Sequence, residues 1–359
     1  MTLGPVERHR VLSIMPTNRC TAACKHCGTL SSPRATDSLT SEQIHAAIRE
    51  GADLGIRIAV FTGGEPTLAL DILLSSIDLA ASLGMLTRVV TNCHWAMGDE
   101  ISLATLRSLR EAGLTEINFS TGDQHTRFVP IIRVLRAIRA ALKFDYSPAV
   151  MVEMIEGCNV SRETVEQHPY YRETLSLFPN QMVTITESPW MPLNTKRRHE
   201  YPPGVAVDNN NVAARRGCDS VLQTLTVQAD GKMGACCGLG LSLIPELNLG
   251  QIGRIPMADA IRTAEEDLLK RWIRAEGPER IIAWAAGHDE SISWEGMYAH
   301  RCQACLRLYK DEAIRKVIRE RYMEKIPDVL FTEWLIHEMR TPSSDAAPLH
   351  KKVSKKNGC

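Results

Sequence analysis

The sequence predicts an α/β protein: an open, partial (β/α)6 barrel of TIM-like type, followed by a small α+β domain of a β-hairpin and helices. Three observations lead to this prediction. From Val11 to about Glu187, short strand-forming runs alternate with segments of helical period, which is typical of a parallel sheet. Asp230 and Gly231 separate two alternating runs, as in a hairpin. Most of the 11 cysteines gather near the N-terminus and in the C-terminal half, which indicates two ligand sites.

The barrel is predicted strand by strand. Strands are expected at residues 11–16, 56–62, 87–91, 116–120, 149–155 and 182–186. The helical pattern of residues 41–54 follows Thr40 and Ser41, either of which can cap a helix. Six strands do not close an eight-stranded barrel, so we expect an open, curved sheet whose functional face is formed by the carboxyl ends of its strands.

The rest of the chain is predicted from its breakers and its returning helical period. A stretch rich in Pro, Asn and Arg begins at Ser188, and the hairpin turn at Asp230-Gly231 is expected to be of type I′. Helices are expected at residues 257–274 and 311–338. We therefore divide the chain into a barrel (1–187), a linker or substrate-facing loop (188–217), a hairpin domain (218–310), C-terminal helices (311–340) and a mobile basic tail (341–359).

Composition narrows the class of protein. The chain has 42 Lys and Arg against 42 Asp and Glu, and 44% of its residues are hydrophobic, so neither disorder nor a nucleic-acid partner is expected. There is no signal-peptide pattern and no membrane-length apolar run, which predicts a cytoplasmic protein without a membrane partner. Because the cytosol keeps thiols reduced, metal ligation is the leading explanation for the cysteines.

Three cysteines, Cys20, Cys24 and Cys27, lie in one loop directly after the first predicted strand. Three soft ligands at this spacing suit an iron–sulfur cluster, and a cubane bound by three thiolates has one iron open for chemistry. The alternative is a zinc knuckle with His26 as the fourth ligand.

This spacing resembles the signature of the radical S-adenosylmethionine (SAM) superfamily. A second resemblance to that family is the motif formed by Gly63, Gly64, Glu65 and Pro66 at the end of the second predicted strand. The resemblance implies a [4Fe-4S] cluster at the three cysteines whose open iron chelates SAM. It further implies that the reduced cluster cleaves SAM and that the 5′-deoxyadenosyl radical takes a hydrogen atom from the substrate. The glycines would allow close approach, and Glu65 would accept from the SAM amino group.

The resemblance also implies contacts from later strand ends. Asn92, Ser120, Asp123 and Glu153 are expected to contact SAM or substrate, and Asp123 and His125 are candidates for catalysis. The alternatives are that Asp123 caps the next helix and that His125 is a partly buried core residue.

Three further side chains are assigned to the site. His26 stands where the family pattern usually has an aromatic residue, and its imidazole can stack on adenine. Cys93 and Cys158 follow predicted strand ends and are candidates for donating a hydrogen atom to a substrate radical. The alternative for both is a buried, inert thiol.

The C-terminal cysteines Cys218, Cys236, Cys302 and Cys305 combine a hairpin with a CxxC loop, which predicts a closed four-thiolate site. This arrangement resembles the SPASM or twitch domain of radical SAM enzymes, which implies one auxiliary [4Fe-4S] cluster. A structural zinc site is the alternative, and Cys237 could replace Cys236.

Function is expected to follow the family. The first hypothesis is an enzyme that modifies a ribosomally made precursor peptide, supplied with electrons by a flavodoxin- or ferredoxin-type reductant. Only about ten residues precede the first predicted strand, so we expect a separate peptide-recognition protein or direct leader binding rather than a fused recognition domain. The alternatives are a dehydrogenase or epimerase of a sugar or aminocyclitol, and a non-catalytic iron–sulfur or zinc scaffold.

Overall fold

The computed structural model describes residues 10–338 and contains one nine-stranded sheet. The order of the strands is β6-β5-β4-β3-β2-β1-β7-β8-β9, and neighbours from β6 to β7 are parallel, whereas β8 and β9 are antiparallel additions. The strands are β1 (Val11–Ile14), β2 (Ile58–Phe61), β3 (Leu86–Thr91), β4 (Glu116–Thr121), β5 (Ala149–Met154), β6 (Thr184–Pro189), β7 (Thr224–Val227), β8 (Lys232–Gly234) and β9 (Asn248–Gln251). The sheet is open, which confirms the predicted α/β fold class.

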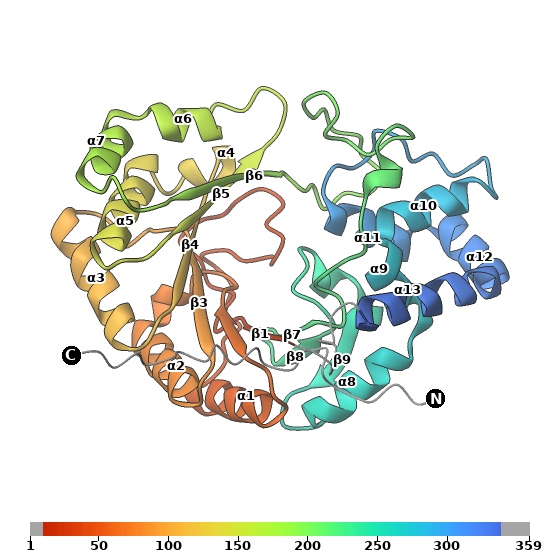
Figure 1. The fold of residues 1–359 in the computed structure, drawn as a ribbon, viewed down its shortest axis with the longest axis horizontal. Coiled ribbons are helices and arrows are strands. Elements are labelled where there is room, and N and C mark those ends of the chain that lie inside the picture. The colour runs from red at the N-terminus through yellow and green to blue at the C-terminus, as the bar shows by residue number, and fades with distance from the viewer. Residues whose placement is uncertain (1–9, 339–359) are drawn as a thin grey trace, which may run out of the picture.

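Helices cover the outside of the curved sheet and form the C-terminal part (Figure 1). The α-helices are α1 (Ser41–Asp53), α2 (Leu70–Ser82), α3 (Asp99–Glu111), α4 (Asp123–Thr126), α5 (Ile131–Lys143), α6 (Arg162–Gln167), α7 (Pro169–Leu177), α8 (Met257–Glu266), α9 (Leu268–Glu276), α10 (Pro278–Ala286), α11 (Arg301–Lys310), α12 (Glu312–Arg321) and α13 (Ile326–Glu338). Short 3-10 helices are η1 (Pro66–Ala69), η2 (Val212–Ala214), η3 (Leu241–Leu243), η4 (Pro245–Leu247) and η5 (Tyr322–Lys325).

The barrel half forms as its local sequence predicts. Thr40 is the N-cap of α1, and a capping box joins it to Gln43. Each predicted strand of this half is present, with bounds shifted by one to three residues, and β6 continues into the predicted linker as far as Pro189. Leu12, Phe61 and other buried side chains of the strands pack against the helices in one hydrophobic core. The core therefore fixes the strands, and their carboxyl ends are left to carry function.

The predicted hairpin exists but joins the barrel sheet. β7 pairs in parallel with β1 along its whole length, so the sheet runs without interruption past residue 218. The predicted type I′ turn is wrong. Gln228 and Lys232 close a three-residue loop in which Gly231 alone has a positive φ, 80°. A left-handed glycine at the end of such a loop is the usual solution for a three-residue hairpin.

The C-terminal helices differ from the prediction at three places. The expected helix 311–338 is α12 and α13, with η5 between them. The expected helix 257–274 is two helices, because Asp267 interrupts it and caps α9. The CQAC run, expected to be a loop, lies in the first turns of α11. Glu333 of α13 pairs with Arg271 and Arg274 of α9, so these charges are buried together.

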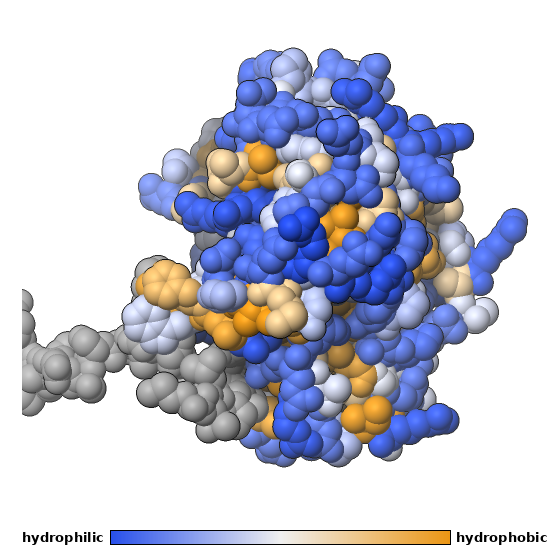
Figure 2. Space-filling view, turned by 90° about the vertical axis from the view of Figure 1, so that its right-hand side faces the viewer, coloured by the Kyte–Doolittle hydropathy of each residue, from blue (hydrophilic) through white to orange (hydrophobic). Residues whose placement is uncertain are grey.

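The surface of these helices is mostly hydrophilic with separate apolar areas (Figure 2). Exposed apolar side chains there include Met323, Phe331 and Trp334. In residues 10–338, no helix is long and apolar enough to cross a membrane. The predicted tail, residues 341–359, and Cys359 lie outside the described residues.

Candidate functional site

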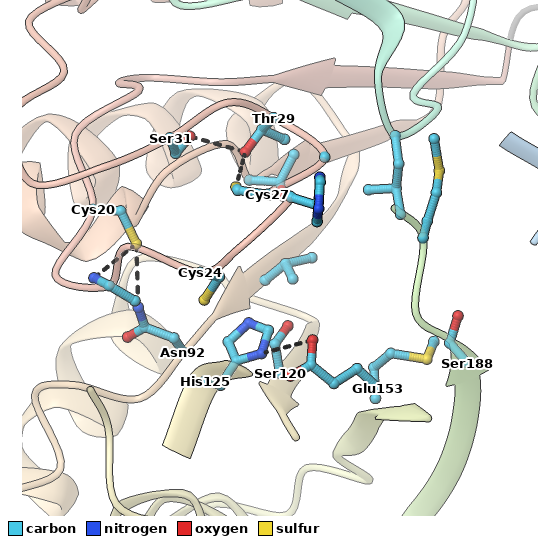
Figure 3. A pocket seen from close by; sticks show the side chains of 18 of the residues that line it. Cys20, Cys24, Cys27, Thr29, Ser31, Asn92, Ser120, His125, Glu153 and Ser188 are labelled. Carbon is cyan, nitrogen blue, oxygen red and sulfur yellow. Dashed lines mark hydrogen bonds and ion pairs between the residues drawn. The ribbon is translucent and has the colours of Figure 1, made fainter. Parts of the chain in front are cut away.

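The carboxyl ends of the barrel strands surround a cavity of about 270 Å³. Figure 3 shows the cysteine loop on one side of this cavity and residues from β4, β5 and β6 on the other. The predicted site residues that line it are Cys20, Cys24, His26, Cys27, Gly63, Gly64, Asn92, Ser120, His125 and Glu153. Five predicted residues do not line it: Glu65, Pro66, Asp123, Cys93 and Cys158.

The three thiols of the N-terminal loop face the same space. The pKa of Cys20 is raised to about 11 and that of Cys24 to about 12, mainly by burial, with smaller contributions from Glu65 on Cys20, from Glu153 on Cys24 and from Cys27 on both. The Cys20 sulfur accepts from the backbone N–H of Ala22 at 3.4 Å and from Nδ2 of Asn92 at 3.5 Å. Such N–H···S bonds are what thiolates in an iron–sulfur site receive, so the donor set fits a cluster with three protein ligands.

The two glycines of the Gly63-Gly64 motif fit the end of β2 against the cysteine loop. The N–H of Gly64 donates to the carbonyl of Thr17 and the N–H of Glu65 to that of Arg19, both at 2.9 Å. A Cβ on Gly64 would lie 2.2 Å from the Arg19 carbonyl oxygen, and Gly63 has a φ of 108°. The close approach that these glycines permit is therefore to the loop that carries the cysteines.

Glu65 is buried behind the cavity in a network of hydrogen bonds. Its carboxylate is fully buried and accepts from the N–H and hydroxyl of Thr67, the hydroxyl of Thr91 and the N–H of Asn92. The predicted contact between Glu65 and the SAM amino group stays a prediction. In this structure Glu65 itself does not line the cavity, whereas its partners Thr91 and Asn92 do. Glu65 also fixes Asn92, whose amide reaches Cys20.

His125 and Glu153 form a pair on the side of the cavity next to Cys24, whose thiol lies 3.6 Å from the carbonyl oxygen of Gln124 (Figure 3). Nδ1 of His125 lies 3.7 Å from Oε2 of Glu153 and is buried without a hydrogen-bond partner. Glycine at position 122 leaves room for the Glu153 side chain, because a Cβ there would lie only 2.0 Å from the Cγ of Glu153. The carboxylate also accepts from the N–H of Gln124. The pair can therefore hold or accept a proton next to a bound molecule.

Asp123 points away from the cavity. Its carboxylate accepts from the N–H groups of Asn159 and Val160 and so holds the loop after β5. The helix-cap alternative is also wrong, since Gly122 is the N-cap of α4. A catalytic or SAM-binding role for Asp123 is not supported by this arrangement.

Cys93 and Cys158 lie outside the cavity as well. Cys93 is fully buried in the hydrophobic core, and burial raises the pKa of its thiol well above the usual range. Cys93, which has a positive φ of 63°, therefore matches the alternative of a buried thiol rather than a hydrogen-atom donor in the cavity. Cys158 is half-buried in the loop after β5.

Sequence reasoning missed the aromatic and apolar walls of the cavity. Trp190 packs edge to face on His26, with ring centroids 5.3 Å apart, and on its other side on His199, also at 5.3 Å. Met151 and Leu239 line the rim, although they are 45% and 38% exposed. The prediction of a substrate-facing loop from Ser188 onward was the only signal for Trp190.

The four C-terminal cysteines form a second group. The pKa of Cys302 is raised to about 12 and those of Cys236 and Cys305 well above the usual range, mainly by burial and in smaller part by the neighbouring thiols of the group. The pKa of Cys218 is also raised, mainly by burial. Cys237 is exposed and contacts Ser220 instead, so Cys236 is the hairpin residue that faces the group.

Backbone donors surround these sulfurs. The N–H of Gly238 donates to Cys236 at 3.4 Å, the N–H of Leu239 bonds Cys302, and the N–H groups of Ser220 and Val221 bond Cys218. This donor pattern fits thiolates that ligate a cluster.

Arg301 joins the two halves of this group. Its guanidinium donates to the carbonyls of Gly217 at 3.0 Å and Arg216 at 2.8 Å, and it lies 3.6 Å from the buried carboxylate of Glu279. Because Arg301 is the first residue of α11, these bonds fasten the segment before Cys218 to the helix of the CxxC pair. The positive end of α11 also favours thiolates.

Among the residues that the structure describes, no three His, Cys, Asp or Glu side chains are arranged to hold a single metal ion. An iron–sulfur cubane is bound differently, with each thiolate on its own iron atom.

Comparison with known proteins finds a family match in the first half of the chain. Residues 14–168 match the family described as the Radical SAM superfamily. The chain is 32% identical to the PqqA peptide cyclase of Rhizobium meliloti over 105 residues, which cover 29% of this chain and 26% of that protein. It is 27% identical to the probable GTP 3′,8-cyclase of Pyrococcus horikoshii, over 41% of this chain and 48% of that protein. The matches thus span about a quarter to a half of the length of these curated relatives.

The fold continues beyond this match. A solved structure of native anSMEcpe with bound AdoMet and Cp18Cys peptide is similar over 91% of this chain and 99% of that chain, with a TM-score of 0.52 and 11% identity. This similarity concerns the fold, and it includes the part of the chain that carries the second cysteine group.

Proposed function

Since residues 14–168 match the Radical SAM superfamily, we propose that the protein is a radical SAM enzyme that modifies a precursor peptide bound in the cavity at the carboxyl ends of the strands. The observation that carries this proposal is the single cavity shared by the three cysteines, the His125–Glu153 pair and an exposed apolar rim. Family membership implies a [4Fe-4S] cluster and SAM.

Each wall of the cavity has its own task in this proposal. Cys20, Cys24 and Cys27 hold the cluster, and when bound, the cluster and SAM supply hydrogen-atom abstraction from the substrate. Asn92 and the backbone of the glycine motif keep the cysteine loop in place. The protein otherwise orients the substrate and excludes water.

His125 and Glu153 form the part of the cavity wall next to Cys24. Their unpartnered Nδ1 and nearby carboxylate stand where a proton released by an oxidised substrate can be accepted. Oxidation also requires an electron acceptor. The second group, Cys218, Cys236, Cys302 and Cys305, has four thiols and backbone N–H donors, which supports one auxiliary [4Fe-4S] cluster in that role.

The peptide substrate is supported by the rim and by one relative. Met151, Trp190, Met191 and Leu239 make an apolar and aromatic border that suits a side chain of an extended peptide. The PqqA peptide cyclase is named for action on a peptide. A separate recognition protein and a flavodoxin- or ferredoxin-type reductant complete the proposal.

A small-molecule substrate is the second candidate, and the similarity to a GTP 3′,8-cyclase is the observation that favours it. A nucleotide would place its base in the same cavity and its phosphates at the mouth. There, Lys25 and Arg197 lie close enough to His26 to lower its pKa, after burial itself.

The test is anaerobic reconstitution with iron and sulfide, followed by SAM, a strong reductant and a short peptide encoded beside the gene. We expect about eight irons per chain, for two cubanes, and 5′-deoxyadenosine together with a peptide mass lower by two hydrogens. Cys24→Ala should abolish both products, whereas Cys237→Ala, at an exposed thiol outside both groups, should leave them unchanged.

Other results would contradict the proposal in distinct ways. Consumption of GTP without change of the peptide would favour the small-molecule candidate. Zinc in place of iron, or intact SAM in the wild type, would leave a metal-stabilised scaffold.

A further inference from the structure

The segment Gly238–Gly240 lies between the two cysteine groups and contacts both. Its three consecutive backbone N–H groups have three different acceptors. The N–H of Gly238 donates to the Cys236 sulfur and the N–H of Leu239 bonds the Cys302 sulfur. The N–H of Gly240 donates to the carbonyl of Gly28 at 2.6 Å, and Gly28 directly follows Cys27.

Close packing reinforces these hydrogen bonds. A Cβ on Gly28 would lie 2.6 Å from Cδ2 of Leu239, so only glycine leaves room for the leucine. A Cβ on Gly238 would lie 3.3 Å from the sulfurs of both Cys236 and Cys302. The segment is therefore held against the auxiliary sulfurs at one end and against the cysteine loop of the barrel at the other.

The side chain between these two ends belongs to the catalytic cavity. Leu239 comes from the hairpin part of the chain, far from the barrel motifs in sequence, yet it lines the same cavity as Cys24 and His125. Its position is set by its own backbone N–H on Cys302 and by its contact with Gly28.

We propose that Leu239 is a positioning residue through which the auxiliary site shapes the SAM cavity. This inference rests on the proposed auxiliary cluster. When Cys236 and Cys302 are held by that cluster, their sulfurs fix the N–H groups of Gly238 and Leu239. Leu239 and Gly240 then fix Gly28 beside Cys27, so SAM binds to an ordered wall. Without that cluster the two sulfurs are not tied to iron, so we expect this wall to be less ordered.

The experiment measures SAM binding and local order, neither of which requires turnover. The dissociation constant for SAM is determined anaerobically from the electron paramagnetic resonance signal of the reduced catalytic cluster. Hydrogen exchange is followed in residues 24–30. We compare the wild type with Leu239→Ala, Cys302→Ala and the double variant, and Cys302→Ser replaces Cys302→Ala if the latter does not fold. Leu243→Ala, in the same loop but outside the cavity lining, is the matched control.

The expected result is a thermodynamic cycle that is not additive. Leu239→Ala and Cys302→Ala should each weaken SAM binding about tenfold and speed exchange in residues 24–30, because both remove the same support. The double variant should be no weaker than either single variant, and Leu243→Ala should bind like the wild type.

Two results would overturn the inference, and they are distinguishable. If the wild type holds auxiliary iron and Cys302→Ala leaves both SAM binding and exchange unchanged, the coupling through Leu239 is wrong while the proposed function stands. If the wild type holds only about four irons, both the proposed auxiliary cluster and the proposed coupling through Leu239 are wrong.

Discussion

Glu65 shows how a single buried carboxylate organises the cavity from behind. It accepts from Thr67, Thr91 and Asn92, three residues on two neighbouring strand ends, and Asn92 in turn reaches Cys20. A buried acceptor that meets several donors is costly to replace, since any donor left without a partner loses its hydration without compensation. The residue therefore acts on the cluster site through stability and placement.

Glu65→Gln tests this role. Oε1 of Glu65 accepts three hydrogen bonds and Oε2 accepts one. The NH₂ group of glutamine must replace one of these oxygens and leave its donors without an acceptor, so we expect a loss of about 1–3 kcal/mol in the free energy of unfolding. Denaturant unfolding of the anaerobic protein measures it. Glu163→Gln, at an exposed position in α6, is the control and should change stability by less than about 0.5 kcal/mol. An equally small loss for Glu65→Gln would show that the network carries no stability.

His94 gives a pH dependence of known sign. Burial lowers the pKa of His94, Glu65 partly offsets this shift, and the nearby Arg133 adds to the lowering. The folded state thus binds the proton more weakly than the unfolded state, whose pKa is about 6.5. Stability present above that value is lost as the pH falls below it.

We therefore expect His94→Gln to lose less stability than the wild type between pH 7 and pH 5, as measured by the denaturant midpoint at each pH. His45→Gln, on a histidine that bonds Ser75 at the surface of α1, should follow the wild-type profile. Parallel profiles for wild type and His94→Gln would contradict the assignment.

At the scale of elements, α11 is the part that assembles the second cysteine group. It carries Cys302 and Cys305 in its first turns, and Arg301 at its start holds Gly217 and Arg216. Gly217 is needed there, because a Cβ would lie 2.0 Å from the carbonyl oxygen of Arg274. The helix thus brings the hairpin cysteines and the CxxC pair to one place.

Arg301→Lys tests whether the hydrogen bonds of Arg301 are needed to assemble the second cysteine group. An ammonium group cannot make the two parallel backbone bonds of the guanidinium, so the segment before Cys218 loosens. After reconstitution we expect iron to fall from about eight toward about four atoms per chain, with the catalytic cluster retained. Arg319→Lys, in an exposed pair with Glu312 on α12, should retain full iron. Full iron in Arg301→Lys would show that the clamp is dispensable.

At the scale of the whole molecule, one sheet joins the barrel strands and the hairpin strands, which the sequence analysis assigns to separate domains. β1 lies between β2 and β7, so a strand from the hairpin region completes the barrel sheet. Leu225 and Val227 of β7 belong to the barrel core, and the N–H of Met257 donates to Glu50 of α1. The two cysteine groups are consequently held in one framework.

Limited trypsin digestion tests this unity. Lys196, Arg197 and Arg198 are exposed in the loop after β6, so cleavage is expected there first. The two fragments should elute together in gel filtration and separate only in denaturant, because the β1–β7 ladder and the shared core hold them. Replacing the three residues with glutamine should slow this cleavage. Fragments that separate under native conditions would show two independent domains.

What could be predicted from the sequence depends on how local the signal is. The cysteine loop, the glycine motif and the alternation of strands and helices each lie within short segments, so the fold class and the match to the Radical SAM superfamily could be predicted from them. The direction of Cys93, the burial of Glu65 and the place of Leu239 depend on contacts between distant segments. Such contacts leave no periodicity, and Arg301 looks like any other charged residue before a CxxC pair.

The central place of β1 has a consequence for synthesis. β1 is translated before any other strand, but its second neighbour β7 leaves the ribosome only after some 200 further residues, which at cellular elongation rates takes about 10–40 s. During that interval one edge of β1 has no strand beside it and can pair with other nascent chains. Iron delivery to the four-cysteine group must also wait until Cys305 has emerged. A holding chaperone and a slow expression temperature would therefore favour the native protein over aggregates.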